Sequence, residues 1–144
     1  MEAGLLGWIG IGGVFGLSAL GSAIGIVISG PAVIGAWKKC YLQKRPAPFI
    51  LVVFAGTVLS NIIYGFILLM SLSASTVLRD PQFFILGLGA GLCIGTVGIT
   101  QSVCSAAAAE AFAETGEGFG SYLMVVGIAE TISLFAVVFT ILFT

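Results

Sequence analysis

Charge is scarce in this sequence. Charged residues account for 8% of the 144 residues and apolar residues for 59%, and the mean hydropathy is +1.22. A soluble domain of this length needs far more charge to cover its surface, so the composition predicts an integral membrane protein. The net charge of −1 also lacks the basic excess of nucleic-acid-binding proteins, so we expect no nucleic-acid partner.

Histidine is absent, and the three cysteines, Cys40, Cys93 and Cys104, form no metal-ligand spacing. The chain therefore lacks the commonest general base and a common metal ligand. The sequence also contains no nucleophile–base pair and no phosphate-binding loop. We expect neither enzymatic activity in this chain nor a resident cofactor.

Long apolar runs separate the few charges. A helix needs about 20 apolar residues to cross roughly 30 Å of hydrocarbon. Four stretches satisfy this requirement: 4–37, 48–78, 82–109 and 119–144. The sequence therefore predicts an all-α membrane protein with four transmembrane helices. We assign these helices to two tandem helical hairpins, residues 1–78 and residues 79–144.

The breaks between the spans predict the orientation of the chain. The first break carries four cations, Lys38, Lys39, Lys44 and Arg45. The positive-inside rule places such a loop in the cytoplasm. Both termini and the turn at Arg79-Asp80 are then expected outside the cytoplasm. The third break, residues 110–118, must also face the cytoplasm although it is acidic, because acidic residues weigh little in that rule.

Glycine is concentrated in the first and third spans. Pairs with the small-xxx-small spacing are Gly12/Gly16, Gly21/Gly25 and Gly91/Gly95. This spacing lets helix backbones approach closely. Because glycine covers more than one face of both spans, we expect these helices to form the crowded inner layer of a ring. We place Gly16 and Gly25 at the contacts that build the ring.

Glu130 is the charged residue that lies well inside a predicted span. It is about 11 residues, or roughly 16 Å, from the start of the fourth span. A carboxylate at that depth costs at least about 2.5 kcal/mol, and ionisable residues inside membranes usually serve a function. No Lys or Arg lies at the same depth to pair with it. We interpret Glu130 as a functional residue.

Other polar side chains fall at a similar depth. Thr57, Ser60, Asn61 and Tyr64 lie at i, i+3, i+4 and i+7 of the second span, which is one face of a helix. Gln101 lies in the third span. Taken singly, each residue is as typical of hydrogen bonding between helices as of ligand binding. Together their oxygen atoms favour reversible binding of Na⁺ or a proton.

The sequence resembles the proteolipid (K, or c) subunit of V-type ATPase rotor rings over nearly its whole length. Four stretches carry the resemblance: LSALGSAIG at 17–25, IYGF at 63–66, LGAGL at 88–92 and AET at 129–131. Residues 38–49 look closest to bacterial V-type members. The resemblance therefore implies a multi-pass protein of a bacterial plasma membrane.

The same resemblance implies partners and ligands. A homo-oligomeric ring in the lipid bilayer would turn against a stator membrane protein, with a central-stalk protein at the cytoplasmic loops. ATP would be hydrolysed elsewhere in the complex. The implied ion-binding set is Glu130, Gln101, Ser60, Asn61 and the backbone carbonyl of Thr57, with a hydrogen bond from Tyr64 to the carboxylate.

Val58-Leu59 stands where the family has Pro-Gly, and Asn61 is one methylene shorter than the family's Gln. Leu59 also stands where a repeat of the hairpin would place a carboxylate, so we expect one ion site per copy of the chain. Two other functions stay open. One is a small four-helix proton-coupled antiporter, and the other is a structural tetraspan or pore-forming protein, which would not need Glu130.

Overall fold

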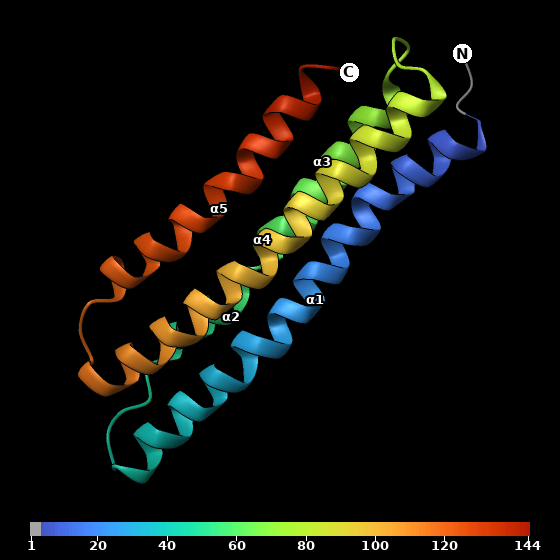
Figure 1. Ribbon diagram of the computed structural model, residues 1–144. Coiled ribbons are helices and arrows are strands. Elements are labelled where there is room, and N and C mark those ends of the chain that lie inside the picture. The colour runs from blue at the N-terminus through green and yellow to red at the C-terminus, as the bar shows by residue number, and fades with distance from the viewer. Residues whose placement is uncertain (1–3) are drawn as a thin grey trace.

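The computed structural model describes residues 4–144, which form helices joined by short connections (Figure 1). Within this described part of the chain, four helical segments are long and apolar enough to cross a membrane. They are α1 (Leu5–Leu42), the segment Phe49–Ala74, α4 (Asp80–Thr115) and α5 (Phe119–Ile141). The predicted fold class is confirmed, and the chain is an integral multi-pass membrane protein.

The helices lie side by side, and their connections alternate between the two ends of the bundle (Figure 1). The C-terminus, the start of α1 and the connection between Ala74 and Asp80 lie at one end. The connection after α1 and the α4–α5 connection lie at the other end. The basic and acidic breaks of the sequence therefore share one end of the molecule.

Both long helices continue past their predicted ends. α1 runs through Lys38 and Lys39 to Leu42, and α4 continues to Thr115, so the predicted break at 110–118 shrinks to residues 116–118. At 1.5 Å per residue, α1 is about 57 Å long, which exceeds a hydrocarbon layer of roughly 30 Å. This length leaves room for the charged last turns of both helices to lie beyond such a layer.

The second predicted span is not one continuous helix. It consists of η1 (Phe49–Leu51), α2 (Val52–Gly56) and α3 (Leu59–Ala74). Thr57 and Val58 separate α2 from α3. The predicted span over 48–78 agrees at its start, but its helical part ends at Ala74 and has an interruption at mid-length.

α1 and α4 pack backbone against backbone through glycine. A Cβ atom added to Gly21 would collide with the backbone of Gly95, and one added to Gly87 would collide with the backbone of Gly10. A Cβ atom on Gly95 would lie 2.6 Å from the carbonyl oxygen of Leu17. Only glycine permits this approach, which brings the two helices into close contact along much of their length.

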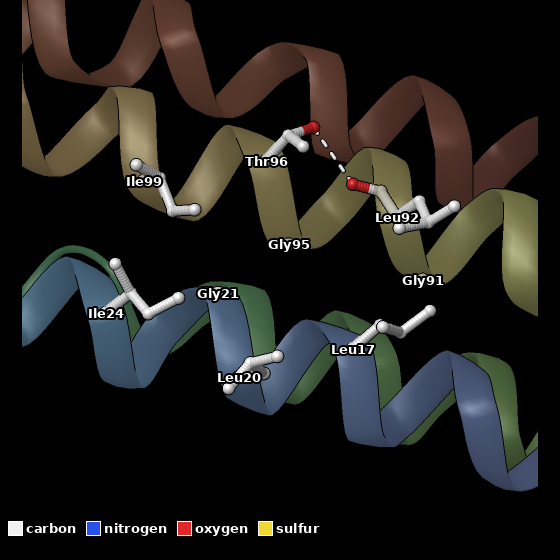
Figure 2. A pocket seen from close by; sticks show the side chains of 9 residues that line it. All are labelled: Leu17, Leu20, Gly21, Ile24, Gly91, Leu92, Gly95, Thr96 and Ile99. Carbon is white, nitrogen blue, oxygen red and sulfur yellow. Dashed lines mark hydrogen bonds between the residues drawn. The ribbon is translucent and has the colours of Figure 1, made fainter.

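The two helices leave a shallow apolar cleft of about 110 Å³ beside this glycine contact. Figure 2 shows that aliphatic side chains flank Gly21 and Gly95 on both helices. They are Leu17, Leu20, Ile24, Leu92 and Ile99. The hydroxyl of Thr96 also lines the cleft, but it donates to the Leu92 carbonyl of its own helix over 2.9 Å.

The predicted ring-contact glycines have different surroundings. A Cβ atom on Gly25 would lie 2.7 Å from Cγ2 of Val58 and 2.9 Å from the carbonyl oxygen of Gly98. Gly25 therefore packs inside the chain, and its assignment to a contact between copies is wrong. A Cβ atom on Gly16 would have no neighbour within 4 Å. Its role at a contact between copies stays a prediction.

Each hairpin caps a long helix of the other. At one end, the Asp80 carboxylate accepts hydrogen bonds from the backbone N–H groups of Gly4 and Gly7, over 2.5 and 3.1 Å. At the other end, the Arg45 guanidinium donates to the carbonyl oxygens of Ala113 and Glu114, over 3.0 and 3.3 Å. These contacts satisfy free backbone groups and place each charge at the favourable end of a helix dipole.

The glycine contact predicts different effects for two alanine substitutions. Gly21→Ala should destabilise the chain by about 1–3 kcal/mol, because its methyl group enters the Gly95 backbone. Gly35→Ala should leave the stability unchanged or slightly higher, because Gly35 is exposed and its methyl group enters open space. Thermal unfolding in detergent, followed by circular dichroism, compares the two variants. Equal midpoints would argue against the backbone contact.

Candidate functional site

Glu130 lies on α5, partly buried, where α3, α4 and α5 meet. The Tyr64 hydroxyl of α3 donates to Glu130 Oε1 over 2.7 Å. The Gln101 side-chain N–H of α4 donates to Glu130 Oε2 over 3.4 Å. Both carboxylate oxygens are therefore held by donors from neighbouring helices.

An amide pair lies behind the carboxylate. The Asn61 side-chain N–H donates to Gln101 Oε1 over 2.8 Å, and both side chains are fully buried. The Ser133 hydroxyl in turn donates to Asn61 Oδ1 over 2.6 Å. The hydrogen bonds thus run in one direction, from Ser133 through Asn61 and Gln101 to Glu130.

The interruption between α2 and α3 lies beside this network. The backbone N–H of Asn61 donates to the carbonyl of Val58 over 3.2 Å, three residues back rather than four. The Val58 carbonyl also accepts the Asn61 side-chain N–H over 3.4 Å and the Ser22 hydroxyl over 3.1 Å. Polar side chains therefore compete with the helical backbone pattern here. The interruption forms although Val58-Leu59 replaces Pro-Gly.

Thr57 and Ser60 form a separate pair at the interruption. The Ser60 hydroxyl donates to the Thr57 carbonyl over 2.9 Å. The Thr57 hydroxyl pairs with the Ser105 hydroxyl of α4 over 2.9 Å. The carbonyl that we predicted as an ion ligand is therefore occupied by Ser60 in this geometry.

Of the residues predicted to surround Glu130, Tyr64 and Gln101 contact it directly, and Asn61 reaches it through Gln101. The sequence analysis missed Ser133, which lies three residues after Glu130. That spacing places both side chains on one face of α5 and could have indicated the connection. Ser22, on α1, gave no such signal.

The surroundings of Glu130 supply hydrogen-bond donors but no opposite charge. The one ion pair within residues 4–144 joins Lys39 and Glu114 at the charged end of the bundle and does not involve Glu130. A carboxylate held in lipid without a cationic side chain is costly while it is charged. Binding one proton or one monovalent cation neutralises it. The arrangement is therefore suited to reversible ion occupancy.

Residues 84–143 match the family model of the ATP synthase c-subunit. The matched stretch runs from the start of α4 to the end of α5 and contains Gln101, Glu130 and Ser133. No curated protein matches the chain. The second hairpin is therefore similar to the ATP synthase c-subunit family.

The location of Glu130 predicts its reactivity. A hydrophobic carbodiimide at low dose should modify Glu130, because the reagent concentrates in lipid. It should spare Glu110, Glu114 and Glu117, which are exposed at the charged end, where the activated acid hydrolyses. Mass spectrometry of peptides from the labelled protein identifies the site, with Glu130→Gln as the control. If these three glutamates at the charged end were modified before Glu130, the placement of Glu130 in lipid would be contradicted.

Proposed function

We propose that this chain, whose second hairpin matches the ATP synthase c-subunit family, is an ion-carrying component of the rotor ring of a V-type ATPase. One observation carries the proposal. Glu130 lies about 11 residues, or roughly 16 Å, into α5 and is held by donors from α3 and α4, and no cationic side chain within residues 4–144 pairs with it. Reversible binding of an ion removes the free-energy cost of this charge in lipid while the ion is bound.

The ATP synthase c-subunit family consists of non-catalytic membrane rotor proteins. The expectation that this chain is not itself an enzyme agrees with that family. ATP hydrolysis belongs to other components of such a complex, and this chain contributes the ion site. The match gives no support to the alternative of a proton-coupled antiporter.

The ion step follows from the cost of charge in lipid. While Glu130 faces lipid, a bound Na⁺ or proton neutralises it; beside a water-filled path in a stator protein, the ion can leave. Tyr64 and Gln101 hold the carboxylate in position between these events. Gln101 Oε1, which accepts from Asn61, has a second lone pair with which it could coordinate a sodium ion. Ser60 and the Thr57 carbonyl would complete the oxygen set.

Small exposed residues on the two long helices support assembly into a ring of identical copies. Gly12 and Gly16 on α1 and Gly89 on α4 are exposed, and a Cβ atom added to any of them would meet nothing within 4 Å. Such positions allow the close helix approach that drives association in lipid. The long, glycine-rich pair α1–α4 would form the inner layer of the ring, with α3 and α5 outside it.

The charged end of the bundle is the proposed docking surface for a central-stalk protein. Lys39 and Arg45 are engaged with the end of α4, but Lys38 and Lys44 are exposed. We propose that this end faces the cytoplasm of a bacterium and that both termini lie outside it. The two hairpins, 1–78 and 79–144, are the proposed units, and the second carries the single carboxylate.

Glu130→Gln should abolish ion transport while the chain still inserts and assembles. The substitution preserves shape but removes the charge that must alternately hold and release an ion. ATP-driven ion uptake by reconstituted complexes measures transport, and the mass of the detergent-purified oligomer checks assembly. Retained pumping by complexes that contain only this variant would refute the proposal. A wild-type monomer or dimer in detergent would instead favour the antiporter.

The identity of the ion can be tested by asking whether Na⁺ protects Glu130 from modification by carbodiimide. If Asn61, Ser60 and Gln101 are ligands, millimolar Na⁺ should protect Glu130 from carbodiimide, because bound sodium displaces the proton that the reagent needs. Gln101→Ala should then raise the Na⁺ concentration for half-protection by at least about tenfold. Labelling without Na⁺ should persist in that variant. Rates that respond to pH but not to Na⁺ would identify a proton-carrying ring.

A further inference from the structure

Ser133 is a buried polar residue that the proposed ion step does not use. It lies on α5, one turn after Glu130, and its side chain has no solvent exposure. Its hydroxyl donates to Asn61 Oδ1 of α3 over 2.6 Å. Asn61 is itself fully buried, so this hydrogen bond lies wholly in the interior.

Several other buried hydroxyls in the bundle behave differently. They donate to the carbonyl four residues earlier in their own helix, a common choice of serine and threonine in helices. The examples are Ser18 to Val14, Ser29 to Gly25, Ser102 to Gly98 and Thr140 to Ala136. Ser133 instead donates to a side chain of another helix. Its hydrogen bond is therefore directed at Asn61 and does more than satisfy the hydroxyl.

The hydrogen bond from Ser133 completes a series of hydrogen bonds that starts and ends on α5 and passes through α4 and α3. Starting from Glu130 on α5, the series passes through Gln101 on α4 and Asn61 on α3 and returns to α5 at Ser133. Asn61 uses both its donor groups and its acceptor, because its N–H groups also reach the Val58 carbonyl. Its amide orientation is fixed on every side, and Gln101 is fixed through it.

We propose that Ser133 is a positioning residue of the ion site. Its hydroxyl holds the short Asn61 side chain against Gln101, and Gln101 in turn holds Glu130. The inference rests on the proposed function, since it concerns the same carboxylate. Without the hydroxyl, Asn61 Oδ1 would lose its donor in the interior, and the amide pair would lose its fixed geometry.

Ser133→Ala should raise the Na⁺ concentration that half-protects Glu130 from carbodiimide by roughly tenfold, as loss of a supporting partner does at other ion sites. The matched control is Thr140→Val, which removes a buried hydroxyl of α5 that bonds only its own helix. The control should leave half-protection unchanged. If Na⁺ protects Glu130 neither in the wild type nor in the variants, the pH at which carbodiimide labelling of Glu130 is half-maximal is compared instead. Unchanged ion dependence in Ser133→Ala would overturn the proposal.

A second measurement does not depend on transport. Asn61 is the only asparagine in the sequence, so rings labelled with [¹⁵N]asparagine give one side-chain amide signal in solid-state NMR. We expect slowly exchanging amide protons in the wild type, a shifted and faster-exchanging signal in Ser133→Ala, and no change in Thr140→Val. An identical Asn61 signal in Ser133→Ala would overturn the role of Ser133. Normal pumping by Glu130→Gln rings would instead overturn the ion-site proposal and leave the NMR result valid.

Discussion

The close contact of α1 with α4 determines the arrangement of the rest of the bundle. Because Gly21 and Gly95 have no side chains, the two long helices approach closely enough to act as one double column. α3 packs on both of them, and α5 packs on α4 and α3. The polar side chains of α3, α4 and α5 therefore face one small region. A side chain at Gly21 would separate α1 from α4 and shift α3, which packs on both, so that Tyr64 and Gln101 would no longer keep their spacing beside Glu130.

The transmembrane pattern was predictable from the sequence because each membrane-spanning segment must be a long run of residues with almost no charge. The four spans and the depth of Glu130 follow from that exclusion, and Asn61, Tyr64 and Gln101 follow from their similar depth. The helix ends were less predictable. α1 continues through Lys38 and Lys39, because a helix ends where its backbone loses partners and not where its side chains become polar.

Hydrogen-bond partners within the site could not be predicted from spacing. A serine in an apolar helix can donate to its own backbone or to a neighbour, and the choice depends on what lies opposite. Ser133 faces Asn61, whereas Ser102 bonds its own helix. The interruption at Thr57 and Val58 is of the same kind. The residues that hold it open, Ser22 among them, come from a distant part of the chain.

The exchange of caps between the hairpins has a mechanical consequence. Asp80 holds the start of α1, and Arg45 holds the end of α4, so the double column has a stop at each end. If α1 slid along α4 by one helical turn, about 5.4 Å, both stops would break together and the glycines would leave register. Sliding of one helix along the other is therefore resisted at both ends of the column. Because α5 packs on α4, the height of Glu130 along the double column is held as well.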